Sequence, residues 1–266
     1  RRWQEGAVLA IACAGLVMLG WSFYEPYLPE VTHVAIASPK LAAPVRLVQI
    51  SDLHCDPAIR LEARLPEIIA EEKPDLIVFT GDAINSREGE PVFKDCMRKL
   101  TAIAPVYGVD GNWEAWWFAD MDVFAGTGVQ KLNGEAVTLN IKKQPICLAG
   151  IGVTHERLVA QTVAKMQPEA YRIFLAHFPA LIGDLAGKVD LHLAGDTHGG
   201  QACLPLLGPL VRIKRFDKVF YFSGLQSIGS TWLYVNRGIG MEGGHVPRVR
   251  FCCRPEITVI DLVPQP

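Results

Sequence analysis

Residues 48–54 read Val-Gln-Ile-Ser-Asp-Leu-His, so an apolar, β-branched run ends in an Asp-x-His motif. A Gly-Asp pair stands at 81–82 and a Gly-Asn pair at 111–112, and the Asp, Asp and Asn of the three motifs are thirty residues apart. About thirty residues make one strand–helix–strand unit, so this spacing predicts three successive strands, each followed by a polar cluster. The strands are expected at 45–50, 76–80 and 105–109.

The second half of the chain has the same arrangement. A strand-like run at 172–176 is followed by a histidine, and a run at 191–194 is followed by Gly-Asp-Thr-His at 195–198. Because open α/β sheets bind ligands beyond the carboxyl ends of their strands, we expect the polar side chains to meet on one rim. Carboxylate, imidazole and amide groups bind divalent metals. The seven predicted ligands are Asp52, His54, Asp82, Asn112, His177, Asp196 and His198.

The order of these motifs resembles that of the calcineurin-like binuclear metallophosphoesterases, and the resemblance covers residues 45–262. Four shorter stretches are similar to a membrane-anchored bacterial branch that includes UDP-2,3-diacylglucosamine pyrophosphatase-like members. These are Glu-Pro at 25–26, His-Gly-Gly-Gln at 198–201, Tyr-Val-Asn-Arg-Gly-Ile-Gly at 234–240 and Arg-Pro-Glu at 254–256.

The resemblance implies an α/β fold, with a two-sheet β-sandwich flanked by helices. It also implies a hydrolase in which a hydroxide between two divalent cations attacks phosphorus. Mn²⁺ is the expected metal, with Fe, Zn and Mg²⁺ as alternatives. Asp82 is expected to bridge the cations and, like Asn112, to be catalytic. The remaining ligands divide into Asp52, His54 and His198 on one cation and Asn112, His177 and Asp196 on the other.

Two positions depart from the family pattern. Trp113 stands where the family has the His of Gly-Asn-His, which removes an imidazole that assists the leaving group or the phosphate. Asp196 stands where the family has the first His of Gly-His-x-His, and a carboxylate favours harder ions such as Mn²⁺ or Mg²⁺. Both changes bear on rate and substrate preference.

Residues beyond the ligands are predicted to contact the substrate. The aromatic cluster at 113 and 116–118 forms either an apolar lip for acyl chains and the membrane interface, or part of the core. Glu114 is a candidate proton donor, with capping or orienting its loop as the alternative. The four predicted contacts are Trp113, Glu114, His155 and Arg237.

Nineteen uncharged residues at 6–24 are enough to cross a bilayer; a buried core helix and a cleaved signal are the alternatives. We therefore expect a membrane helix at 1–24, a proline-rich connector at 25–44 and the catalytic domain at 45–266. The expected location is the bacterial cell membrane, single-pass or peripheral. The two N-terminal arginines place the domain outside the cytoplasm by the positive-inside rule, whereas a nucleotide–lipid substrate requires the cytoplasmic face.

The composition excludes some classes of protein. A net charge of −2 and a pI near 6.4 argue against a nucleic-acid-binding surface. Seven cysteines without a C-x-x-C motif argue against a disulfide framework or a zinc finger. No protein partner can be inferred.

Further helices are predicted at 61–72, 93–104 and 154–166, and further strands at 137–141, 144–153, 219–222, 231–235, 249–253 and 257–262.

The predicted function is metal-dependent hydrolysis of a phosphodiester or pyrophosphate bond. The expected substrate is a phosphorylated small molecule or, more specifically, a membrane lipid such as UDP-2,3-diacylglucosamine. A general phosphodiesterase is one alternative. The other is a metal-binding or regulatory protein with weakened catalysis, because Trp113 replaces the family histidine.

Overall fold

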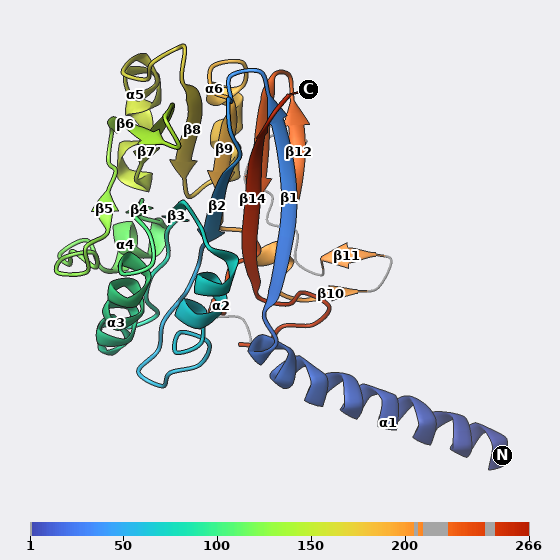
Figure 1. Cartoon of the computed structure of the whole chain (residues 1–266). Coiled ribbons are helices and arrows are strands. Elements are labelled where there is room, and N and C mark those ends of the chain that lie inside the picture. Colours follow the sequence, from blue (N-terminus) through green and yellow to red (C-terminus); the bar gives the residue numbers. More distant parts are fainter. Residues whose placement is uncertain (1, 205–206, 210–222, 243–247, 266) are drawn as a thin grey trace.

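The computed structural model describes residues 2–204, 207–209, 223–242 and 248–265, and it contains two mixed sheets packed face to face (Figure 1). The first sheet has the order β1 (Glu30–Ser38), β14 (Glu256–Pro264), β2 (Val45–Ile50), β3 (Leu76–Phe79), β4 (Val106–Gly108) and β5 (Gln130–Lys131). The second has the order β12 (Gly224–Ile228), β13 (Thr231–Val235), β9 (Leu191–Ala194), β8 (Tyr171–Ala176), β7 (Gln144–Ile151) and β6 (Glu135–Ile141). A separate short hairpin pairs β10 (Cys203–Leu204) with β11 (Gly208–Pro209).

Alternation along the strands builds three apolar layers. Leu47 of β2 and Leu193 of β9 point into the core between the sheets. Val48, the next residue, packs in the layer beneath α2 (Leu65–Glu72) and α3 (Glu90–Thr101). On the far side, Phe174 of β8 packs in the layer that includes residues of α5 (Val159–Ala164) and α6 (Ile182–Leu185). These layers confirm the predicted two-sheet fold with flanking helices.

The five strands that precede the predicted ligands lie within one residue of their predicted bounds. β2, β3 and β4 pair in parallel, as do β8 and β9, so their carboxyl ends lie at one edge of each sheet. The predicted helix at 154–166 divides into the 3₁₀ helix η3 (Val153–Leu158) and α5. The remaining short helices are α4 (Asn112–Trp117), η1 (Glu25–Tyr27), η2 (Arg87–Gly89), η4 (Pro179–Leu181) and η5 (His198–Gly200).

The segment 25–44, which the sequence suggests is a connector, contains strand β1. This strand pairs in parallel with β14 along all nine residues. Pro29 and Pro39 lie directly outside the strand and so remove no hydrogen bond from it.

The predicted strand at 249–253 is wrong. Residue 251 makes one isolated bridge with residue 202, and Cys252 has a left-handed φ of 50°. The backbone amides of Cys252 and Cys253 donate to the carboxylate of Glu25, so they are not available to a sheet. The predicted strand at 219–222 lies outside the described residues.

The N-terminal helix α1 (Arg2–Tyr24) projects away from the two-sheet body at the lower right of Figure 1. Among the described residues, only the helical stretch Trp3–Tyr27 is long and apolar enough to cross a membrane, a property that signal sequences share. Most side chains of α1 are exposed, while Ser22 near its end is buried. The helix therefore meets the folded domain only at its carboxyl end.

Candidate metal centre

All seven predicted ligands come from loops at the carboxyl ends of β2, β3, β4, β8 and β9, where the two sheets meet. One carboxylate oxygen lies between two groups of predicted ligands, which form the two sides of the centre. The Oδ2 atom of Asp82 is 3.5 Å from Nε2 of His54 and 3.4 Å from Nε2 of His177. Atoms that bind one metal at about 2.1 Å are themselves about 3 to 3.5 Å apart. Oδ2 of Asp82 is therefore within this spacing of both histidines.

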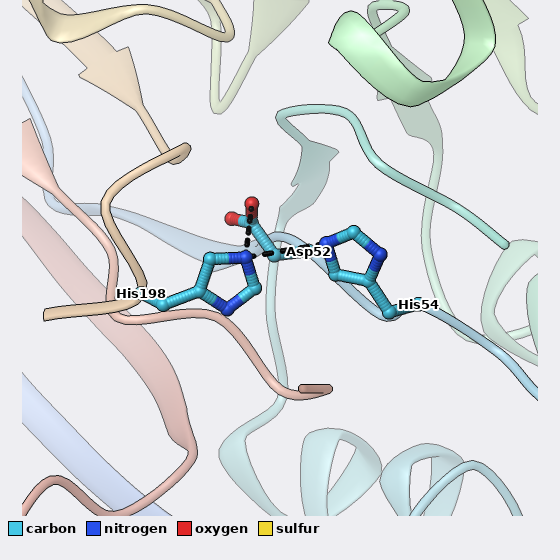
Figure 2. Close-up of side chains that lie close together, drawn as sticks. All are labelled: Asp52, His54 and His198. Atoms are coloured by element: carbon cyan, nitrogen blue, oxygen red, sulfur yellow. Dashed lines mark hydrogen bonds and ion pairs between the residues drawn. The ribbon is translucent and has the colours of Figure 1, made fainter. Parts of the chain in front are cut away.

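The first side of the centre is shown in Figure 2, where three side chains converge. Nε2 of His198 is 3.2 Å from Nε2 of His54 and 3.4 Å from Oδ1 of Asp52. These three residues can offer ligand atoms within 4.8 Å of one another, and so can Asp52, Asp82 and His177. Asp52 thus belongs to both groups by distance.

The second side is built around His177. Its Nε2 lies 2.8 Å from Oδ1 of Asn112 and 3.7 Å from Oδ1 of Asp196. Its Nδ1 lies 2.7 Å from the Thr80 carbonyl oxygen, a contact that orients the ring when this nitrogen carries the proton. Metal-binding histidines make this kind of contact with their other ring nitrogen.

The chemical environment suits cations. Asp52 and His54 are fully buried, and Oδ2 of Asp52 has no hydrogen-bond partner among the described residues. Burial is the main cause that raises the pKa of Asp52 to about 8 and lowers that of His54 to about 4, and burial also lowers the pKa of His198. Neutral imidazoles are the form that binds metal, and a bound cation would offset the cost of burying the carboxylate.

The backbone is strained at the same loops. Left-handed φ values occur at Asp52 (50°), His54 (42°), Asp82 (60°), Asp196 (70°) and His198 (49°). Such conformations are uncommon for residues with a side chain and cluster at functional sites. Five of the seven predicted ligands adopt them, so the surrounding fold holds these side chains against a local preference.

Two motif glycines allow the loops to come together. A Cβ atom on Gly111 would lie 2.1 Å from Oδ1 of Asp82. A Cβ atom on Gly195 would lie 2.4 Å from Oδ2 of Asp52 and 2.1 Å from Oγ of Ser51. Each glycine directly precedes one predicted ligand and lies against another. The strand ends could not come this close if either position carried a side chain.

Trp113 lies against the first side of the centre. Its ring meets that of His54 edge to face, with centroids 4.9 Å apart, and stacks on Phe118 at 6.4 Å. Its backbone N donates to Oδ1 of Asp82 at 2.9 Å. The residue that replaces the family histidine thus borders the ligands with an apolar ring.

Glu114 is placed behind the ligands rather than among them. Its Oε2 accepts hydrogen bonds from the backbone N of Asp82 (2.9 Å) and of Gly111 (2.8 Å), and its Oε1 accepts one from Ala83 N (2.8 Å). Burial, followed by the charge of Asp82, raises its pKa to about 7. With both oxygens occupied by backbone amides, this carboxyl group favours the loop-orienting alternative.

The two remaining predicted contacts have other partners. Nδ1 of His155 lies 2.8 Å from Oγ1 of the adjacent Thr154, in η3. The guanidinium of Arg237 donates to Glu30 at 2.8 Å and to Glu256 at 3.2 Å, on β1 and β14. These ion pairs account for the charge of Arg237 without a phosphate.

Sequence reasoning missed Arg250, whose side chain is fully buried. Its guanidinium donates to backbone carbonyl oxygens, including those of Gly240 (2.6 Å) and Arg237 (2.9 Å). Gly240 N in turn donates to the Asp52 carbonyl oxygen at 2.7 Å. The only signal in the sequence was an arginine inside the apolar run at 249–253.

Comparisons with known proteins identify the family of this chain. The calcineurin-like phosphoesterase family profile matches residues 45–221. An uncharacterised metallophosphoesterase of Bacillus subtilis (strain 168), YkuE, is 32% identical, over 98% of this chain and 96% of its own length. The phosphodiesterase YaeI of Escherichia coli (strain K12) is 30% identical, over 84% of this chain and 83% of its own length.

A solved structure, that of GAP50, the anchor in the inner membrane complex of Plasmodium, has the same fold. It covers 82% of this chain with a TM-score of 0.51 and 11% identity. Family profile and full-length relatives together show that this chain belongs to the calcineurin-like phosphoesterase family and is a metal-dependent hydrolase of phosphoester bonds.

Proposed function

We propose that this protein hydrolyses a phosphodiester or pyrophosphate bond at a dinuclear metal centre. The distances support a division of the ligands into Asp52, His54 and His198 for one cation and Asn112, His177 and Asp196 for the other, with Asp82 shared. The observation that carries the proposal is the position of Asp82 Oδ2 between His54 and His177. We propose Mn²⁺ as the metal, because the ligand set contains three carboxylates and an amide oxygen.

Two divalent cations, when bound, supply an activated water and neutralise charge on the phosphoryl group. The residues of the chain hold this arrangement in place. Glu114 fixes the backbone of Asp82 through two neighbouring amides, and the Trp113 backbone N holds the other carboxylate oxygen of Asp82. The shared ligand is therefore pre-oriented, which lowers the cost of assembling the site.

The substrate class follows from the surroundings of the site. The name of the relative YaeI supports a phosphodiester. Trp116 and Trp117, on the short helix that begins at Asn112, are 52% and 66% exposed. Exposed tryptophans suit an acylated substrate at a membrane interface, where α1 would anchor the protein to the bacterial cell membrane. We therefore propose a lipid-linked substrate such as UDP-2,3-diacylglucosamine.

The test is a substrate comparison with Mn²⁺-loaded full-length protein. We expect turnover of an aryl phosphodiester and faster turnover of UDP-2,3-diacylglucosamine in mixed micelles than of UDP-glucose. Trp117→Ser should lower the rate on the acylated substrate and leave that on the aryl diester unchanged. Equal rates on the acylated and unacylated compounds would overturn the lipid assignment. Absence of turnover on any of them by metal-loaded protein would overturn the proposed reaction.

A second proposal, weaker catalysis in a binding or regulatory role, is favoured by one observation. The ring of Trp113 occupies the border of the centre beside His54, where the family has an imidazole. The same assay decides between the two: a protein that binds two metals and the substrate but turns it over at the uncatalysed rate would support this alternative.

A further inference from the structure

A buried carboxylate lies at the end of the apolar helix. Glu25 is 2% exposed although it directly follows α1. Its Oε2 accepts hydrogen bonds from the indole Nε1 of Trp21 at 2.7 Å and from Cys252 N at 2.9 Å, and its Oε1 accepts one from Cys253 N at 2.6 Å. A buried charge is costly unless it is hydrogen-bonded, so these three donors fix the helix end against residues 250–253.

Residues 250–253, termed the strap, join the helix end to the turn that carries His198. On the helix side, Arg250 N donates to the Ser22 carbonyl oxygen at 3.0 Å. On the other side, Sγ of Cys253 donates to the carbonyl oxygen of His198 at 3.2 Å, and Phe251 N donates to that of Gln201 at 3.1 Å. The strap therefore contacts the backbone of a predicted ligand directly.

The strap also reaches a second ligand, Asp52. The buried guanidinium of Arg250 donates to the carbonyl oxygens of Gly238 at 3.1 Å and of Gly240 at 2.6 Å. Gly238 lies so close to Asp52 that a Cβ atom would be 2.7 Å from its Cβ, and Gly240 N donates to the Asp52 carbonyl oxygen at 2.7 Å. Both ligands that the strap supports belong to the group shown in Figure 2.

We propose that Glu25 is a positioning residue that couples the docked end of α1 to the metal site of Asp52, His54 and His198. This inference rests on the proposed dinuclear centre. The carboxylate holds two successive strap amides. The strap holds the backbone of His198 directly, and Arg250 supports Asp52 through Gly238 and Gly240. His177 and Asn112 follow β8 and β4, and among the described residues the strap makes no hydrogen bond to either. His198, which the strap contacts directly, belongs to the first group alone, whereas Asp52 belongs to both, so the second cation should depend less on Glu25.

The experiment is a calorimetric titration of metal-free, full-length protein with Mn²⁺. Wild type should show two binding events. In Glu25→Gln, one carboxylate oxygen becomes an NH₂ group, which donates hydrogen bonds and cannot accept them. One backbone N–H of the strap therefore loses its acceptor. A hydrogen-bond partner of a metal ligand is typically worth roughly 10- to 100-fold in metal affinity, and Glu25 acts one contact further away, through the strap, so its loss should weaken binding by up to about 10-fold. We expect this loss in one event, the same one that disappears in His198→Ala, and near wild-type affinity in the event that disappears in His177→Ala.

The matched control is Asp75→Asn. This carboxylate also holds a backbone amide, that of Arg46 at 2.8 Å, but it lies at the amino end of β3, away from the metal centre. Both binding events should be unchanged in this variant. If Glu25→Gln does not fold, Trp21→Phe decides, because it removes only the indole donor and should weaken the same event by a few-fold.

Equal weakening of both events in Glu25→Gln would mean a general loss of structure and would overturn the inference. So would unchanged affinities in a folded variant. These results are distinct from failure of the proposed function, in which wild type itself binds no metal.

Discussion

The carboxylates at the amino ends of the parallel strands have different partners from those at the carboxyl ends. At the amino ends, carboxylates meet basic side chains. Arg46 Nε lies 2.8 Å from Asp261, Lys142 Nζ lies 2.6 Å from Asp75, and Lys40 Nζ lies 2.7 Å from Asp190. At the carboxyl ends, carboxylates meet imidazoles: Asp82 lies 3.5 Å from His54 and 3.4 Å from His177, and Asp52 lies 3.4 Å from His198.

Burial and backbone differ in the same direction. The carboxylates at the amino ends are partly exposed, and none of these three aspartates has a left-handed φ. Asp52 and Asp82 are buried and left-handed. Stability alone would favour the amino-end arrangement, because a buried carboxylate without a cation is costly. The difference indicates that the carboxyl end is organised for bound cations and the amino end for the fold.

The largest effect should come from removing the shared carboxylate. Asp82→Ala is expected to lower turnover by at least about 1,000-fold, since metal charge stabilisation is worth several kcal/mol and each 1.36 kcal/mol is tenfold. Asp196→Ala, which alters one predicted metal group, should cost less. Asp75→Asn, at the amino end, should leave kcat within about twofold. Near-normal turnover in Asp82→Ala would contradict the conclusion that the carboxyl end, unlike the amino end, is organised for bound cations.

A smaller effect is expected at Trp113. If the family imidazole protonates the leaving group, Trp113→His should raise turnover of an alkyl phosphodiester relative to an aryl one by about 100-fold, the lower end of general acid catalysis. Steady-state rates on both esters in both proteins measure the ratio. A uniform change on the two esters would assign Trp113 to packing or binding.

The close approach of strand ends can be tested at Gly195. In Gly195→Ala, the new methyl group would meet Oδ2 of Asp52 and Oγ of Ser51, and such overpacking costs about 1–3 kcal/mol. Urea unfolding of metal-free protein should show this loss, and Mn²⁺ affinity should fall with it. The control is Gly187→Ala, at a left-handed glycine whose Cβ would meet nothing within 4 Å. A larger loss of metal affinity in the control than in Gly195→Ala would contradict the packing account.

The amino end should show the smallest effect, and one that depends on pH. The hydrogen bond from Arg46 is the main cause that lowers the pKa of Asp261. A depressed folded-state pKa stabilises the protein above the unfolded value of about 3.9, and this contribution is lost as pH falls through the folded value. Asp261→Asn should therefore cost about 1 kcal/mol or less at pH 7 and almost nothing near pH 2. If the loss of stability caused by Asp261→Asn increased as the pH fell, the result would contradict this account.

The sequence predicts most of the fold because the strands that precede the ligands are short, apolar and evenly spaced. The strand at 45–50 and that at 191–194 have their predicted bounds. β1 was missed because prolines flank it and its partner, β14, is more than 200 residues away. The strand predicted at 249–253 was wrong because its amides are taken by Glu25, a partner that no local pattern reveals.

The candidate site shows the same limit. Motif order predicts which side chains face one another, since strand ends on one edge must be close. It does not predict their supports. Arg250 and Glu25 act through backbone atoms of distant residues. Arg237 was predicted to contact the substrate from the family-like run at 234–240, and its ion pair with Glu30 could not be foreseen because β1 was not predicted. For Glu114 the sequence leaves two roles open, proton donor and loop-orienting residue, because a carboxylate beside a motif suits both.

Metal stoichiometry tests most directly whether the carboxyl end holds two cations. Protein purified without chelator, then incubated with Mn²⁺ and freed of unbound metal, should contain close to two metal ions per chain by elemental analysis. Asp82→Ala should contain fewer than one, and Asp75→Asn should still contain two. Finding no bound metal in the wild-type protein after this incubation would contradict the assignment of the site.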